Sequence, residues 1–73
     1  MSIFSERLKL CRKTQNKTQK DIANSLGLTE NGYQKYEISN REPKMETLNK
    51  LADYFGVSVD YLMGRTDNPK LNL

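Results

Sequence analysis

Residues 18–38, TQKDIANSLGLTENGYQKYEI, decide the fold of this chain. Three apolar residues in the first half recur with the spacing of one helical face: Ile22, Ala23 and Leu26. Gly27 follows at a point where a helix ends readily, because glycine adopts a left-handed backbone without a Cβ penalty. Thr29 is then a favourable N-cap for another helix. The stretch predicts two helices joined by a tight turn.

The second of these helices has two different faces. Tyr33 and Tyr36 continue the apolar face. The opposite face carries side chains that form hydrogen bonds readily: Glu30, Asn31, Gln34 and Lys35. A helix-turn-helix lays its second helix in the major groove of DNA, which gives such a polar face a function. Polar residues also cover the solvated face of ordinary helices, so the pattern alone leaves both interpretations open.

Length and composition limit the other classes of function. A chain of 73 residues forms one small domain. It contains no histidine and one cysteine, which argues against a histidine-based catalytic triad, a zinc site and an internal disulfide. Its four glycines are too scattered for a phosphate-binding loop. We therefore expect a protein that is not an enzyme and uses no metal or cofactor.

The sequence also bears on location and charge. It has no apolar run of membrane-spanning length and no basic-then-apolar signal pattern at its start, so we expect a cytoplasmic, nucleoid-associated protein. The net charge of +3 is uneven, because residues 1–44 carry nine Lys and Arg against five Asp and Glu. Mild positive charge favours polyanions, although many ordinary proteins carry a similar surplus.

Helical periodicity continues on both sides of the central stretch. A first helix is predicted over residues 4–14, with one face formed by Phe4, Leu8 and Cys11. Cys11 is interpreted as a small core residue, with a redox role as the alternative. Further helices are predicted over residues 45–55 and 59–63, each followed by a glycine.

These elements define the expected domain organisation. Five short helices with short connections predict an all-α domain over residues 1–64. Residues 65–73, RTDNPKLNL, combine proline with polar residues, so we expect a flexible C-terminal tail.

Most of the chain resembles the DNA-binding domain of Cro/repressor-type helix-turn-helix proteins, the XRE-like family. The resemblance lies in RLKLCRKTQNKTQKDIANSLGLTENGYQKYE, NREP and METLNKLADYFGVSVDYLMG, and extends over residues 4–64. It is specific, because TQ opens the second helix, SLGLT forms the turn and YE closes the third helix. It implies a compact, lambda-repressor-like domain of five helices that binds double-stranded DNA.

The resemblance implies which residues hold the DNA backbone. Gln19 matches a glutamine that grips a phosphate and braces the reading helix, and Thr18 and Lys20 share its helix N-terminus, which favours anions. In the loop before the fourth helix, three residues match positions that clamp the backbone: Asn40, Arg41 and Lys44. Lys17 replaces a usual apolar residue, and it either faces a phosphate or is simply solvated.

The resemblance makes the third helix the one that reads bases. Its implied base-reading residues are Glu30, Asn31, Gly32, Gln34 and Lys35. Asn and Gln pair bidentately with adenine, and Lys with guanine. Gly32 allows the edge of the groove to approach the backbone. Glu30 either accepts a hydrogen bond from cytosine N4 or discriminates against other bases.

Arg12 and Glu37 match family positions that form a salt bridge between the first and third helices. A partly buried pair of this kind orients the reading helix more than it adds net stability. The alternative is two independent surface charges.

The leading hypothesis is a sequence-specific DNA-binding transcriptional regulator, a repressor that binds a palindromic operator as a homodimer. A single reading helix specifies few base pairs, so useful specificity requires a dimer. The dimer surface is expected from the fifth helix and the tail, at Val59, Tyr61, Met63 and Leu71. The alternative for these residues is that they close the core of the monomer.

Two other hypotheses assign the domain a different role. In the first, the chain is an antitoxin that binds and neutralises a toxin protein. In the second, it is the N-terminal module of a longer sensor protein. A toxin or an antirepressor is the protein partner that these hypotheses imply. A toxin gene in the neighbouring reading frame would favour the antitoxin.

Overall fold

The computed structural model describes residues 2–38 and 42–70. The described residues form five helices: α1 (Ile3–Thr14), α2 (Gln19–Leu26), α3 (Glu30–Ile38), α4 (Met45–Phe55) and α5 (Val59–Leu62). The predicted all-α fold is therefore confirmed, with α1 starting and α5 ending one residue earlier than predicted. Over the described ranges, no helix combines the length and hydrophobicity needed to cross a membrane.

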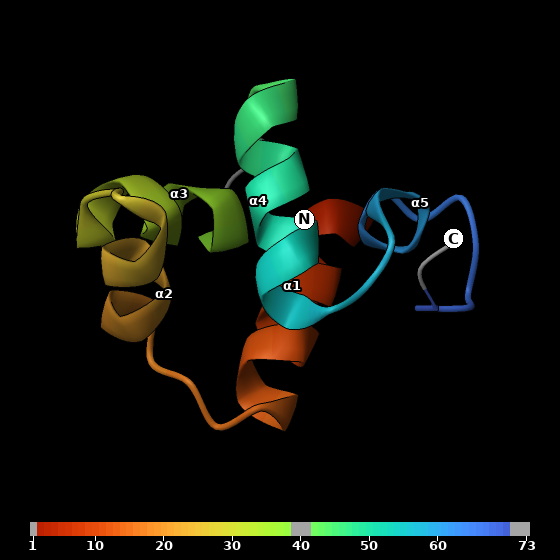
Figure 1. Ribbon diagram of the computed structural model, residues 1–73, viewed down its shortest axis with the longest axis horizontal. Coiled ribbons are helices and arrows are strands. Elements are labelled where there is room, and N and C mark those ends of the chain that lie inside the picture. Colours follow the sequence, from red (N-terminus) through yellow and green to blue (C-terminus); the bar gives the residue numbers. More distant parts are fainter. Residues whose placement is uncertain (1, 39–41, 71–73) are drawn as a thin grey trace.

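The helices are arranged around one shared core. Figure 1 shows α1 and α4 crossing in the middle of the molecule, with α2 and α3 on one side and α5 on the other. Each helix contributes an apolar side chain with an exposed fraction of 0%: Leu8, Ile22, Tyr33, Leu51 and Leu62. Complete burial of one such side chain contributes about 1.5–3 kcal/mol. Cys11 lies in the same core, where burial raises the pKa of its thiol.

Local hydrogen bonds fix where the helices begin. The Ser2 hydroxyl accepts from the Ser5 N–H at 3.1 Å before α1, and the Ser58 hydroxyl accepts from the Tyr61 N–H at 3.0 Å before α5. α4 differs, because Lys44 at its N-cap forms no side-chain capping hydrogen bond. Lysine has no acceptor atom for that role.

Arg7 holds the segment after α5 against the helices. Its Nη1 donates to the backbone carbonyls of Tyr61 and Thr66, each at 2.8 Å. Its Nη2 forms an ion pair with Asp67 Oδ1 at 2.9 Å. The guanidinium carbon also lies 4.1 Å from the centre of the Tyr61 ring, which is a cation–π contact. One side chain of α1 thus binds both α5 and the chain that follows it.

The described part of the expected C-terminal tail forms a further hydrogen bond with the helices. The Ser58 N–H donates to the Pro69 carbonyl at 3.0 Å, so residues 66–69 are held at both ends. Composition indicated only a loop, because the residue that binds it lies far away in the sequence. Residues 71–73, which include Leu71, lie outside the described part of the chain.

Candidate nucleic-acid interface

α2 and α3 form the predicted helix-turn-helix, and both ends of α2 have a local cause. At its start, the Thr18 hydroxyl accepts from the Asp21 N–H, and the Asp21 carboxylate accepts from the Thr18 N–H, each at 3.0 Å. At its end, Gly27 has a φ of 69°. The Leu28 N–H then donates to the Ala23 carbonyl at 2.8 Å. This pattern satisfies carbonyls at the end of α2 and turns the chain toward α3.

The start of α3 gives Gly32 a structural role that sequence reasoning missed. The Thr29 hydroxyl accepts from the Gly32 N–H at 3.0 Å, as an N-cap does. A Cβ at Gly32 would lie 2.9 Å from that hydroxyl oxygen, closer than real Cβ atoms approach. Glycine at this position therefore leaves room for the cap, whether or not it also approaches DNA.

α3 separates its residues cleanly by face. Tyr33 and Glu37 are buried with exposed fractions of 0%. The four predicted readers with side chains are all exposed: Glu30, Asn31, Gln34 and Lys35. The buried face fixes the helix in the core, and the opposite face carries the four predicted readers at the surface.

A buried carboxylate joins the first three helices. Arg12 of α1 donates from Nε to Glu37 Oε2 at 2.7 Å and from Nη2 to Glu37 Oε1 at 3.0 Å. Gln19 of α2 donates from Nε2 to the same Oε1 at 3.2 Å. Arg12 also reaches the Lys17 carbonyl, which lies in the α1–α2 link, at 3.3 Å. The structure thus contains the ion pair that the resemblance implied and adds Gln19 to it.

The surroundings of Glu37 keep it charged. Burial by itself raises the pKa of this carboxyl, but the hydrogen bonds from Arg12 and the other donors around it outweigh burial and hold the pKa below its usual value. The Tyr33 hydroxyl, whose contact with Glu37 falls outside regular hydrogen-bond geometry, contributes to the same lowering of the Glu37 pKa. A charged Glu37 and a charged Arg12 fix α3 relative to α1.

The predicted phosphate residues of α2 lie together at its N-terminus. Lys17, Thr18 and Lys20 are exposed, and Gln19 is half-buried because its amide turns inward to Glu37. The Thr18 N–H and hydroxyl are both engaged by Asp21. The hydrogen bond from the Thr18 N–H, followed by that from the Thr18 side chain, lowers the pKa of the Asp21 carboxyl, so a negative charge occupies the first turn.

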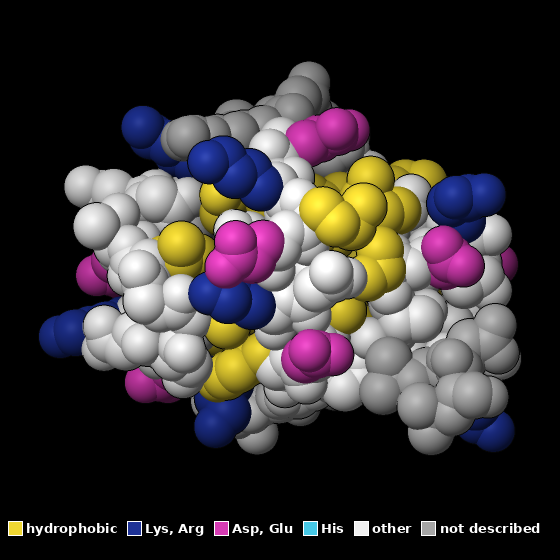
Figure 2. Space-filling model, turned by 45° about the horizontal axis from the view of Figure 1, so that its top comes forward, with side chains coloured by type: hydrophobic (Ala, Val, Ile, Leu, Met, Phe, Trp, Pro, Cys, Tyr) yellow, Lys and Arg dark blue, Asp and Glu magenta, His cyan; other side chains and the backbone are white. Residues whose placement is uncertain are grey.

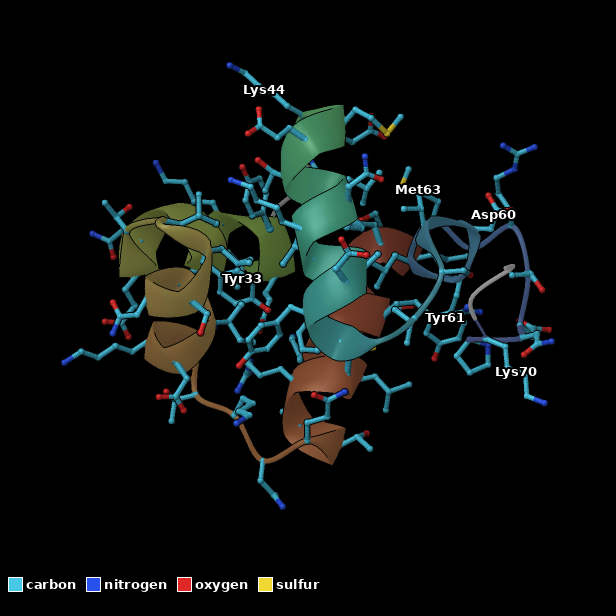
Figure 3. All side chains as sticks on the ribbon, viewed as in Figure 1. Tyr33, Lys44, Asp60, Tyr61, Met63 and Lys70 are labelled. Carbon is cyan, nitrogen blue, oxygen red and sulfur yellow. The ribbon has the colours of Figure 1, made fainter. Side chains whose placement is uncertain are left out.

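Lys44 is placed apart from the α2 residues. Its side chain is exposed, and Figure 3 shows it at the N-terminal end of α4, pointing away from the core. The two other loop residues of the predicted phosphate set, Asn40 and Arg41, lie outside the described residues.

Charge on the visible surface is mixed. Figure 2 shows Lys and Arg side chains interspersed with Asp and Glu on this face, without one continuous basic area. A surface of this kind attracts a polyanion only moderately by long-range steering. Specific contacts from individual side chains must then supply most of the discrimination between partners.

The predicted dimer residues do not share one outward face. Val59, Tyr61 and Met63 are all half-buried and pack against the core. Figure 3 shows Tyr61 and Met63 leaving α5 in different directions. The Tyr61 ring is already covered by Arg7, whereas Leu71 lies outside the described residues.

Sequence reasoning missed Arg7 and the Tyr33 hydroxyl as polar groups of interest. In the sequence, Arg7 is one of several basic residues of the first helix, and nothing in its neighbours indicates the carbonyls that it binds. Tyr33 was predicted only as an apolar contact, although a tyrosine in a core position carries a hydroxyl that needs a partner.

Comparison with known proteins agrees with this geometry. A family model described as helix-turn-helix matches residues 8–62. The prophage-derived HTH-type transcriptional regulator YonR of Bacillus subtilis is 47% identical over 64 residues, which cover 88% of this chain and 59% of YonR. The cryptic phage CTXphi transcriptional repressor RstR of Vibrio cholerae is 45% identical over 62 residues, covering 85% of this chain and 55% of RstR.

A third relative is matched over a larger share of this chain. The HTH-type transcriptional regulator ImmR of Bacillus subtilis is 39% identical over 69 residues, which cover 94% of this chain and 54% of ImmR. This chain therefore spans only a little over half the length of these relatives. The capped α2, the Gly27 turn and the two-faced α3 lie inside the matched segment of the family model. This chain belongs to the helix-turn-helix family, as its resemblance to Cro/repressor-type proteins indicated.

Proposed function

We propose that this chain is the DNA-binding part of a transcriptional regulator, a repressor that recognises a specific operator through α3. The observation that carries this proposal is the combination of an exposed polar face on α3 with a buried Arg12–Glu37 pair behind it. A helix that reads bases must be held in a fixed orientation, because bidentate contacts tolerate little displacement. Its relatives YonR and ImmR, which are named as transcriptional regulators, and RstR, which is named as a repressor, support the same role.

In this proposal the polar residues divide into two groups. Asn31, Gln34 and Lys35 contact base edges, with Glu30 and Gly32 beside them at the start of α3. The residues that hold phosphates are Lys17, Thr18, Gln19, Lys20, Asn40, Arg41 and Lys44. Base contacts carry the sequence preference, whereas phosphate contacts set register and bring the dependence on salt.

Repression follows from occupancy of the operator. A bound domain blocks other proteins from the same stretch of DNA, so no chemical step is required. A palindromic operator would place two copies on half-sites one helical turn apart. The half-buried Val59 and Met63 at α5 are the contacts proposed between copies, because α5 lies on the opposite side of the molecule from α2 and α3 (Figure 1).

The test is selection of bound sequences from random DNA, followed by fluorescence anisotropy with the selected site and a scrambled site of equal length. We expect binding at least about 1,000-fold tighter to the selected site at moderate salt, which is the lower end of the usual range for specific recognition, about 10³–10⁷. Sedimentation with and without the site reports whether two copies bind. Equal affinity for both DNAs would refute the proposal.

A further inference from the structure

Ile38, the last residue of α3, is an apolar side chain that lies largely outside the core. Its exposed fraction is 60%, whereas Tyr33 and Glu37 of the same helix are completely buried. The described residues contain three other large apolar side chains of high exposure, which belong to α1 and α4: Ile3, Leu10 and Met45. Scattered exposed apolar residues are common, so the position of Ile38 on its helix must decide whether it has a role.

Ile38 lies among the predicted base-reading residues. It follows Gln34 by four positions, Lys35 by three and Asn31 by seven, and residues at these spacings share one face of a helix. Figure 3 shows Tyr33 on the other side of α3, pointing into the interior of the molecule. The exposed face of α3 therefore contains one apolar side chain bordered by side chains that form hydrogen bonds.

The local preferences of a helix do not favour isoleucine at this position. A β-branched side chain loses rotamer freedom in a helix, and the last turn favours a cation that complements the macrodipole. The position is also fixed in space, because the preceding residue, Glu37, is held by Arg12 at 2.7 and 3.0 Å. A stiff side chain at a fixed place on the reading face is suited to one defined contact.

The major groove offers one apolar substituent that such a side chain can contact. This substituent is the C5-methyl group of thymine, since the other groups that distinguish the base pairs are hydrogen-bond donors and acceptors. The amides of Asn31 and Gln34 suit adenine, whose partner in the duplex is thymine. A single A·T pair thus presents an adenine edge for an amide and a methyl group for an apolar side chain.

We propose that Ile38 is a specificity-determining residue that contacts the C5-methyl group of a thymine in the operator. A recognition helix enters the groove with its N-terminal residues, so its last turn lies closer to the wall of the groove. The methyl group is the part of an A·T pair that lies nearest that wall on the major-groove side. This inference rests on the proposed function, because it requires α3 to lie in the major groove.

Replacement of thymine by deoxyuridine tests the proposal, because it removes only the methyl group. Each thymine of the selected DNA site is replaced in turn, and affinity is measured by fluorescence anisotropy. For the unaltered chain we expect one replacement to weaken binding by about threefold to fivefold, as for the burial of one methyl group. Ile38→Ala should bind the thymine and deoxyuridine forms of that site equally, and Ile38→Val should retain part of the difference.

Two controls separate this effect from a loss of folding. Leu10→Ala truncates another exposed apolar side chain, on α1, and should retain the full difference between thymine and deoxyuridine. Thermal unfolding of Ile38→Ala should give an unchanged or raised melting temperature, since alanine has the higher helix propensity and Ile38 is mostly exposed. A strongly destabilised Ile38→Ala would show that the side chain belongs to the core and would overturn the proposal.

Other results would overturn the proposal and leave the proposed function intact. One is that no deoxyuridine replacement affects the unaltered chain more than it affects Ile38→Ala. Another is that Ile38→Ala weakens binding to selected and scrambled DNA by the same factor, which would place the side chain against the sugar–phosphate backbone. A third is that Ile38→Ala changes only self-association in sedimentation, which would indicate a contact between copies. If the unaltered chain does not prefer the selected site to scrambled DNA, the proposed function fails and this inference fails with it.

Discussion

Arg12 and Glu37 form a bidentate ion pair, at 2.7 and 3.0 Å, that joins α1 to α3 in the interior of the molecule. The Glu37 side chain is completely buried, whereas 16% of the Arg12 side chain is exposed. The pair thus fixes α3 to α1 from the side opposite to the exposed face of α3. Its consequences are testable by stability, by pH and by DNA binding.

Removing Arg12 should destabilise the domain strongly. Arg12→Ala leaves the Glu37 carboxylate buried without its charged partner, and we expect a loss of about 3–5 kcal/mol in the free energy of unfolding. Urea unfolding followed by circular dichroism measures it. Glu46→Gln is the matched control, because it breaks the exposed Glu46–Lys50 pair at 3.5 Å and should change stability by less than about 1 kcal/mol. If both variants lowered the free energy of unfolding by a similarly small amount, the Arg12–Glu37 pair would not be what holds α3 to α1.

The buried carboxylate also predicts a loss of stability in acid. The Glu37 pKa in the folded protein lies below its ordinary value of 4.5, so folding favours the charged form. The contribution is fully present above that ordinary value and is lost as the pH falls through the lower folded value. Unfolding free energy should therefore decline below about pH 4.5, and Glu37→Gln should flatten the decline. Asp21→Asn is the comparison, because the exposed Asp21 shifts in the same direction. If the free energy of unfolding of Glu37→Gln declined equally steeply in acid, the acid sensitivity would come from other groups than Glu37.

Base-reading and phosphate-holding residues should differ in their effect on DNA binding. Gln34→Ala is expected to cost about 1–3 kcal/mol on the selected site and to relax the preference at one base position, and Lys35→Ala should do the same. Lys44→Ala should weaken all sequences alike and reduce the salt slope by about 1. Lys70→Ala removes the same charge on the α5 side of the molecule, away from Lys44 (Figure 3), and serves as the control. If Gln34→Ala and Lys44→Ala changed affinity, base preference and salt slope in the same way, the division into base-reading and phosphate-holding residues would be wrong.

Gly32 and Thr29 should be coupled in stability. Gly32→Ala gains about 1 kcal/mol of helix propensity but places a Cβ against the capping hydroxyl, so the two effects nearly cancel in the unaltered chain. In a Thr29→Ala background no cap remains to disturb, and the same substitution should stabilise by about 1 kcal/mol. Equal effects in both backgrounds, measured by urea unfolding, would mean that the glycine does not protect the cap.

Arg7 should control the order of the chain after α5. Arg7→Lys keeps the charge but cannot span the carbonyls of Tyr61 and Thr66 together with Asp67, because lysine lacks the planar fork of donors. We expect a loss of about 1–3 kcal/mol and faster hydrogen exchange at the Ser58 N–H, which bonds to the Pro69 carbonyl. Arg65→Ala alters an exposed arginine nearby and should leave that exchange rate unchanged. Unchanged exchange in Arg7→Lys would show that the segment is held by other contacts.

The five helices and most of their ends were predictable from the order of the residues, because these features depend on neighbours in the chain. Apolar spacing marked the buried faces, and Thr18, Gly27 and Gly56 act on backbone groups within a few residues of themselves. It also separated the exposed face of α3 from the buried one, since periodicity assigns a residue to a face. The pairing of Arg12 with Glu37 came from resemblance to a family rather than from such local rules.

The contacts between polar groups of distant segments were not predictable in this way, because they depend on how the helices pack. Arg7 binding the chain after α5, and Gln19 sharing the Glu37 carboxylate with Arg12, both depend on where whole helices lie. The same holds for the Tyr33 hydroxyl, which a helical pattern counts only as part of an apolar ring. Hydrogen bonds act over about 3 Å, so the partners of a polar group are fixed by how the helices pack. That packing depends on the whole chain rather than on neighbouring residues.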